Sequence, residues 1–193
     1  RRRQEVQEQR QNAQIARGQC TSLLHKLNDA LPIIEAHTNV VGKAFDEQTV
    51  SLWKDRVAKI RAEIARLSTS NASIRGNPDD GALEAGSYKA MYSVYFGLHS
   101  ELQGVEQDVD QLTEELKEAQ TLQVGITAIL TDTVSTSRQA EESIGAIKAQ
   151  GFIVEGPLRV LTEACQVLAE AHSAVEAKDI FRAQKLSEDA KSL

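Results

Sequence analysis

Apolar residues recur at alternating spacings of three and four along this chain, and this period constrains its fold more than any other feature. The spacing places successive apolar side chains on one face of an α-helix, where a neighbouring helix can bury them. The three clearest stripes are Leu102, Val105, Val109, Leu112, Leu116 and Ala119; Trp53, Val57, Ile60, Ile64 and Leu67; and Cys20, Leu24, Leu27, Leu31 and Ile34. The pattern predicts long helices that pack along a stripe.

The composition also favours helices. Aromatic residues make up 4% of the chain, which has 11 glycines and 3 prolines, whereas helix-favouring Ala, Leu, Glu, Gln and Lys dominate. At 193 residues the chain can bury a core without disulfides or metal ions. We therefore predict an all-α fold, an elongated antiparallel helical bundle that is spectrin-like or rich in coiled coil. We expect residues 1–156 to form this bundle and residues 157–193 a C-terminal helical hairpin packed on the same unit.

Turn-forming residues divide the first half of the chain. A first helix is expected from near residue 2 to about His37, with Pro32 kinking or breaking it because proline removes an internal hydrogen bond. We expect residues 37–46 to be a connector. A second helix is expected to follow and to end near Ser73, before the dense turn formers of residues 76–81.

The second half of the chain is expected to hold a helix over residues 82–123 and then a segment rich in β-branched residues. Residues 121–136 favour helix, but their alternating β-branched side chains leave a strand open. A connector is expected at residues 151–156, with Pro157 in the first turn of the next helix. A turn at residues 177–179 should close the C-terminal hairpin.

The two cysteines, Cys20 and Cys165, are far apart in the sequence, and each falls on an apolar helical stripe. We interpret both as small buried hydrophobic residues in a reducing compartment rather than as a redox pair.

The chain begins with three arginines and no initiator methionine, so we expect it to be part of a longer protein. Residues 1–17 contain five arginines and two glutamates, a net charge of +3; because the whole chain carries −6, the rest carries −9. Such a basic cluster is typical of the cytoplasmic side of a transmembrane helix, although a solvated helix start has the same composition. No apolar run approaches the ~20 residues that cross a bilayer. We expect a cytoplasmic domain, at the inner face of the membrane if a tether outside these residues holds it there.

One segment concentrates residues suited to protein contacts. Tyr88, Tyr92 and Tyr95 lie at helical spacing with His99 alongside, and tyrosine is enriched at interfaces, although a wide core stripe would look the same. Residues 101–118 hold seven acids and one lysine, which form either a solvated face or a site for a basic partner. The candidate partner contacts are Tyr88, Tyr92, Tyr95, His99, Glu106, Asp110 and Glu114.

No pattern in the sequence carries catalytic or ligand chemistry. The histidines lie in no zinc motif, none follows a glutamate by three positions, and there is no nucleophile elbow, phosphate-binding loop or CxxC pair. We therefore predict no catalytic residue, no metal and no cofactor, and we expect a protein that is not an enzyme. Its negative charge argues against nucleic acid as a partner. We expect other proteins as partners, and a homodimer stays open because heptads close within one chain or between two.

Features near the start of the chain resemble the membrane-proximal segment of bacterial septation-ring regulators. They are Arg1-Arg2-Arg3 opening a glutamine-rich helix, Pro32, residues 42–45, and Leu52-Trp53-Lys54-Asp55-Arg56. Proteins of that family span the membrane once, and their cytoplasmic part is built from spectrin-like triple-helical repeats. The resemblance implies a cytoskeletal scaffold that contacts division proteins. The acidic helical segment is equally similar to the tails that follow a transmembrane helix in other bacterial membrane-anchored proteins.

Three functional hypotheses follow. The first is a helical scaffold or spacer, tethered to a membrane, that holds contact faces at a fixed distance. The second is a soluble adaptor that binds a partner peptide through the hairpin of residues 157–193. The third is a membrane-bending helical dimer, which requires a broadly basic surface.

Overall fold

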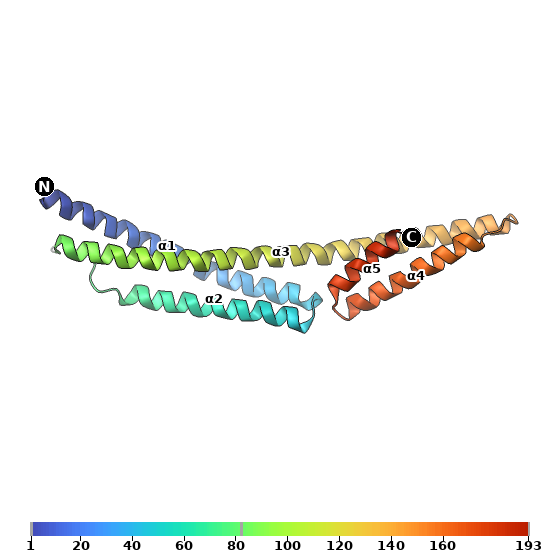
Figure 1. The fold of residues 1–193 in the computed structure, drawn as a ribbon, viewed down its shortest axis with the longest axis horizontal. Helices are drawn as coiled ribbons and strands as arrows, with labels where there is room; N and C mark the ends of the chain where they lie inside the picture. Colours follow the sequence, from blue (N-terminus) through green and yellow to red (C-terminus); the bar gives the residue numbers. More distant parts are fainter. Residues whose placement is uncertain (1, 82, 193) are drawn as a thin grey trace. The chain divides into compact units, whose positions relative to one another are not determined.

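The computed structural model describes residues 2–81 and 83–192, and within these residues it is all-α (Figure 1). No strand occurs among them, so the predicted fold class is confirmed. The elements in chain order are α1 (Arg2–Val41), the 3-10 helix η1 (Gly42–Ala44), α2 (Glu47–Ser73), α3 (Ala85–Ala149), α4 (Glu155–Glu176) and α5 (Ile180–Ser192). The predicted elongated shape and spectrin-like arrangement remain predictions.

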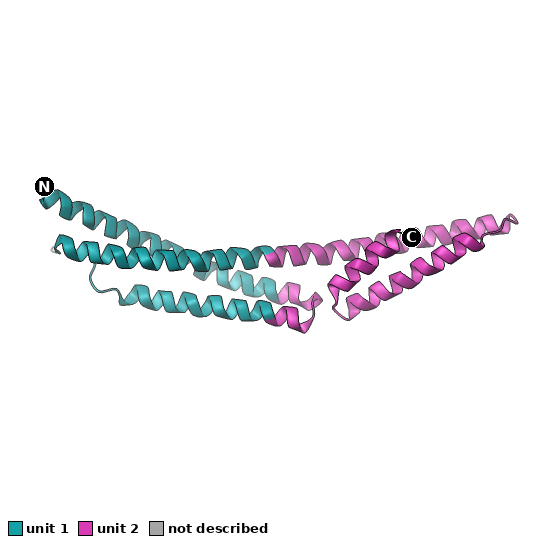
Figure 2. Ribbon diagram, viewed as in Figure 1, with its two compact units in different colours: residues 1–38, 52–114 teal, residues 39–51, 115–193 magenta. Residues whose placement is uncertain are grey.

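The chain divides into two compact units (Figure 2). Unit 1 comprises Arg1–Thr38 and Leu52–Glu114, and unit 2 comprises Asn39–Ser51 and Glu115–Leu193. Helix α3 contributes to both units, because its first 30 residues belong to unit 1 and the remainder to unit 2. The predicted boundary after residue 156 therefore lies inside unit 2, which contains the C-terminal hairpin together with half of α3.

The predicted stripes form the core. Every residue of the α2 stripe and of the α3 stripe is buried, as are Cys20, Leu24, Leu27 and Ile34 on α1. At the edges of this seam in unit 1, Arg61 of α2 pairs with Glu35 of α1, and Arg66 Nη2 of α2 lies 2.5 Å from Glu101 Oε2 of α3. Exposed pairs of this kind add little stability, so burial of the stripes holds unit 1 together.

Helix α1 is longer than the sequence predicted. It continues through Pro32, which is exposed, and ends at Val41. The prediction that a connector begins at residue 37 was therefore wrong, because the helix extends to Val41. Thr38 and Val41 are both buried, and the Thr38 hydroxyl donates a 2.8 Å hydrogen bond to the Ile34 carbonyl. Burial of these two side chains favours a longer helix. Helix α1 ends at Val41, where Gly42 begins the short 3-10 helix η1.

Helix α3 is also longer than predicted, because it runs on past residue 123 to Ala149. Residues 121–136 are helical throughout, which resolves the strand alternative in favour of helix. Ile126, Leu130 and Thr133 continue the buried stripe, and this burial outweighs the modest helix cost of β-branched residues. Threonine hydroxyls in this stretch donate to the carbonyl four residues earlier, which satisfies them within the helix: Thr121, Thr127, Thr131, Thr133 and Thr136.

The hairpin of α4 and α5 in unit 2 closes at the predicted turn. Lys178 adopts a left-handed conformation with φ of 62°, and the Asp179 backbone N–H donates to the Ala174 carbonyl at 2.9 Å. The Asp179 carboxylate then accepts a 3.1 Å hydrogen bond from the Arg182 N–H, which caps the start of α5. The turn thus lies where the sequence predicted it, at residues 177–179.

Small residues line the interface of this hairpin. Ala171, Ala183 and Ser187 are completely buried, so the two helices approach closely. Cys165 is exposed, and the prediction that it is buried was wrong. The buried stripe of α4 instead includes the preceding residue, Ala164, and then Leu168, Ala171 and Ala174.

Candidate protein-contact groove

A groove lies between α1 and α3 on unit 1. One part of it, of about 440 Å³, is lined by Asn12, Ile15, Ala16, Gln19, Tyr92, Phe96, His99 and Gln103. A second hollow of about 540 Å³ extends it toward Lys26 and Glu106. The two hollows share Ile15, Gln19, His99 and Gln103. They therefore form one surface, which we call the α1–α3 groove.

The α1–α3 groove contains exposed apolar side chains. Ile15 is 52% exposed and Phe96 62% exposed. The rings of Tyr92 and Phe96, one helical turn apart, have centroids 6.0 Å apart. Apolar side chains gathered in a hollow differ from the single exposed residues found on any protein surface, and such gatherings mark contact sites. Ile15, Tyr92 and Phe96 thus give the groove an aliphatic and aromatic floor, and His99 lines the groove beside them.

Polar side chains also line the groove. Asn12, Gln19 and Gln103 supply amide groups that both donate and accept hydrogen bonds. At the far end, Lys26 Nζ lies 2.5 Å from Glu106 Oε1. The hydrogen bond to Glu106, together with the negative charges of Glu106 and Asp110, raises the pKa of Lys26 above its ordinary value. Exposed apolar side chains beside polar ones are a usual composition of a protein interface.

Three of the predicted partner contacts line this groove. Tyr92 and His99 lie at its centre and Glu106 at its far end. Asp110 and Glu114 are exposed on α3 but do not line it. The acidic side chains of α3 therefore border the groove without forming its floor.

Tyr88 and Tyr95 belong to the core of unit 1, so the structure does not offer them to a partner. Tyr88 is completely buried, and its hydroxyl donates to the Asp80 carbonyl. Tyr95 is also buried, which raises the pKa of its phenol, and its carbonyl accepts a 3.1 Å hydrogen bond from Cys20 Sγ. The alternative of a core stripe thus applies to these two tyrosines and not to Tyr92.

The sequence did not reveal the α1 side of the groove. Ile15 and Gln19 flank the buried residue Ala16 on α1. The signal that could have found this side is Ile15 itself, an aliphatic residue one position off the stripe that leads from Ala16 to Cys20. Its partners on α3 could not be identified from the sequence, because they lie more than 75 positions away.

Two arginines of the basic N-terminal segment have partners in the turn after α2. Arg10 Nη2 donates to the Asp79 carbonyl at 2.6 Å, and Arg17 Nη1 donates to Asn77 Oδ1 at 2.8 Å. Arg17 also pairs with the Asp79 carboxylate at 3.0 Å. These contacts fix the turn against α1, a structural role for the basic residues that the sequence did not reveal.

Among residues 2–81 and 83–192 there is no cluster of three or more potential metal ligands, and no helix is both long and apolar enough to cross a membrane. Comparison with known proteins found no protein-family model, no curated protein and no solved structure that matches this chain. The groove geometry is therefore the basis for assigning a function.

Proposed function

We propose that this protein is a non-enzymatic helical scaffold or spacer that acts through protein–protein contacts, with the α1–α3 groove as its contact site. The observation that carries the proposal is the exposed apolar floor of Ile15, Tyr92 and Phe96, which lies beside polar side chains in one groove. The floor rests on a closed core, because Cys20, Tyr95 and Leu98 beneath it are buried. A rigid surface of this kind binds without a large ordering cost.

The occupant that fits the groove is an amphipathic helix of a partner protein. A helix laid along α1 and α3 would place an aliphatic stripe on Tyr92 and Phe96. The amide side chains of the groove would then form hydrogen bonds with polar residues of that helix. The far end of the groove carries Glu106 and, beyond it, Asp110, with Lys26 neutralising part of this charge. We therefore expect a basic residue at the end of the partner helix that reaches Glu106.

We also propose that a segment outside these 193 residues tethers the protein to a membrane. The helical units would then lie on the cytoplasmic side of that membrane. The support for this tether is the net charge of +3 over residues 1–17. The tether is not needed for the groove to bind, so the two parts are tested separately.

The test of the groove uses photo-crosslinking in cells. A benzophenone amino acid at position 96 should crosslink to a defined protein segment, identified by mass spectrometry, that has the pattern of an amphipathic helix. A synthetic peptide of that segment should bind the full chain, and Phe96→Asp should weaken its affinity at least tenfold. The matched control is Val94→Asp, because Val94 is 53% exposed on the same helix but lies outside the groove. Equal effects of both substitutions would contradict the proposal.

The alternative is a soluble adaptor that binds a peptide through residues 157–193. The face between α4 and α5 is closed, since Ala171, Ala183 and Ser187 are completely buried there. A peptide would therefore have to use the surface that the hairpin leaves open beside α3. Deleting residues 157–193 should abolish partner binding under this alternative, and retained binding would contradict it.

A further inference from the structure

The loop that joins α3 to α4 exposes apolar side chains to solvent. Phe152 is 64% exposed and Ile153 is 89% exposed, the largest exposed fraction of any large hydrophobic residue in the described part of the chain. Ile147, in the last turn of α3, is 44% exposed. The loop lies at the end of unit 2 where α3 turns back into α4 (Figure 2). Three exposed apolar side chains therefore lie at one protruding end of unit 2, which we call the tip.

The loop has a defined conformation that keeps these side chains outside the core. The backbone N–H groups of Gln150 and Gly151 donate to the carbonyls of Ile147 and Lys148, at 3.1 and 3.0 Å. Gly151 has a φ of 88°, which glycine adopts readily and other residues rarely do. At the other end of the loop, Val154 is buried. Both ends of the loop are thus fixed, and the two residues between Gly151 and Val154 face solvent.

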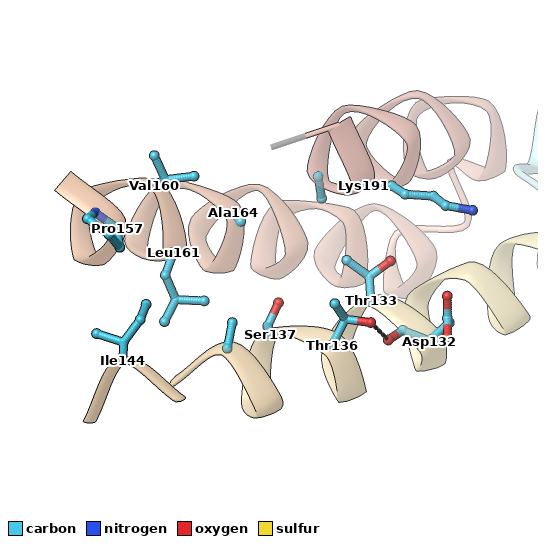
Figure 3. Close-up of a pocket in the computed structure, with 12 residues that line it drawn as sticks. Asp132, Thr133, Thr136, Ser137, Ile144, Pro157, Val160, Leu161, Ala164 and Lys191 are labelled. Atoms are coloured by element: carbon cyan, nitrogen blue, oxygen red, sulfur yellow. Dashed lines mark hydrogen bonds between the residues drawn. The ribbon is translucent and has the colours of Figure 1, made fainter. Parts of the chain in front are cut away.

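The apolar surface continues behind the loop, in a groove of about 660 Å³ between α3 and α4 (Figure 3). The side chains of Ile144 on α3 and Leu161 on α4 point toward one another across this groove in Figure 3. Pro157 and Val160 also line it near the loop. The opposite end, next to α5, is lined by polar side chains that include Asp132, Thr133, Thr136 and Lys191. The apolar part of this surface therefore lies toward the tip.

Acidic residues are sparse at the tip, although the chain as a whole carries a net charge of −6. Residues 143–162 contain two bases, Lys148 and Arg159, and one acid, Glu155, so their net charge is +1. The next acids on either side are Glu142 and Glu163. Anionic lipid headgroups attract lysine and arginine and repel acidic surfaces. The tip can therefore approach an anionic membrane surface without the repulsion that the rest of the chain would meet.

We propose that the tip of unit 2 inserts Ile147, Phe152 and Ile153 into the interface of a lipid bilayer. Exposed apolar patches with polar surroundings mark contact sites for proteins or membranes. A protruding loop fits a bilayer, because lipids move apart around it, whereas a protein partner would need a pocket of matching shape. Lys148 and Arg159 would stay at the level of the headgroups while their aliphatic stems follow the apolar residues.

The inserted surface is small, so the binding is weak and reversible and depends on the apolar side chains of the loop. A membrane tether elsewhere in the protein would raise the effective concentration of the tip at the bilayer. The insertion itself is independent of that tether and of the α1–α3 groove, so each of the three proposals fails or succeeds separately.

The first test places an environment-sensitive fluorophore on the loop. The full chain with Cys165→Ser and Gln150→Cys is labelled with a nitrobenzoxadiazole dye, while Cys20 is buried and stays unlabelled. With vesicles of phosphatidylcholine and phosphatidylglycerol, the emission should rise and shift to the blue, and quenchers on the acyl chains should reduce it. The matched control carries the dye at Gln107→Cys, an exposed glutamine of unit 1, and should show neither change.

Three outcomes of this labelling experiment would overturn the proposal. The first is an unchanged emission at position 150 in the presence of vesicles. The second is the same change at positions 150 and 107, which would mean that the dye or the whole protein adsorbs without orientation. The third is a change at position 150 that needs no vesicles and grows with protein concentration, because it would show that a second copy covers the tip.

The second test measures cosedimentation of the full chain with the same vesicles. Ile153→Glu should lower the affinity at least tenfold, because a carboxylate is costly to remove from water. Circular dichroism checks that this exposed substitution leaves the fold intact. Val94→Glu is the matched control, since it adds the same charge at an exposed aliphatic position in unit 1. Equal weakening by both substitutions, or no binding at millimolar lipid, would overturn the proposal.

The salt dependence of cosedimentation separates insertion from electrostatic adsorption. Insertion of apolar side chains should persist in about 0.5 M salt, where attraction between exposed charges is largely screened. Loss of all binding at that salt concentration would show that Lys148 and Arg159 alone hold the tip at the surface, and it would overturn insertion.

Discussion

The two units bury different kinds of side chain along helical seams of the same period. Unit 1 closes over large residues such as Tyr88, Leu67 and Leu102, each completely or almost completely buried. The hairpin of unit 2 closes over Ala171, Ala183 and Ser187. The first unit is held by apolar area, and the hairpin by the close approach that small side chains allow.

This difference in the size of the buried side chains determines where each unit leaves apolar side chains exposed. Stabilisation by burial grows with the apolar area removed from water, at roughly 25 cal/mol per Å², so unit 1 completes its core and leaves its groove on top of a closed seam. Unit 2 gains less from its small residues and leaves part of the seam itself uncovered.

Among the tests of this difference between the units, Leu102→Ala in unit 1 should have the largest effect on stability. Leu102 is completely buried, so its truncation should leave a cavity and cost about 2–5 kcal/mol of unfolding free energy. Urea unfolding followed by the fluorescence of Trp53, the single tryptophan of the chain and a buried residue of unit 1, measures this loss. Leu52→Ala, at an exposed position of α2, should stay within about 0.5 kcal/mol. A comparable loss of unfolding free energy in Leu102→Ala and Leu52→Ala would contradict a core of large buried residues in unit 1.

In unit 2, the close approach of α4 and α5 predicts that adding side-chain volume, rather than removing it, destabilises the fold. Ala171→Leu should destabilise the hairpin by about 1–3 kcal/mol, because the added side chain has no space at a completely buried position. Amide hydrogen exchange of α4 and α5 would show this as faster opening. Ala169→Leu, exposed on the same helix, provides the control. An unchanged exchange rate in Ala171→Leu would mean that the hairpin is loosely packed.

A pH-dependent effect distinguishes the cysteines of the two units. Burial raises the pKa of the Cys20 thiol from 9.0 to about 11, whereas Cys165 is exposed. The unfolded chain ionises Cys20 near pH 9 while the folded chain keeps it neutral. Unit 1 therefore has the full benefit of the neutral thiol below pH 9 and loses it as the pH rises to 11, by about 2–3 kcal/mol in total.

The measurement is Trp53-detected urea unfolding at intervals from pH 8 to 11. Other groups also titrate in this window, so the decisive quantity is the difference between the native chain and Cys20→Ala, whose stability should fall less steeply. Cys165→Ala should match the native chain. Parallel curves for the native chain and Cys20→Ala would show that the folded protein ionises Cys20 as readily as the unfolded chain does.

Local signals predicted much of the fold and part of the candidate site. The turn formers of residues 76–81 and the turn at residues 177–179 lie where expected, and the stripe from Leu102 to Ala119 is buried throughout. The sequence could not separate Tyr92 from Tyr88 and Tyr95, because all three share one helical stretch. Which of them faces solvent depends on how α1 packs against α3.

The sequence by itself determined that this chain is helical, where its strongest turns lie and which stripes are buried, because period, turn residues and helix propensity act over a few neighbouring positions. Only the tertiary structure decided that α1 and α3 run past their expected ends, that Cys165 is exposed, and that Ile15 meets Tyr92 and Phe96 in one groove. These outcomes depend on which side chains a neighbouring helix covers, and that choice is made by contacts between residues far apart in the chain.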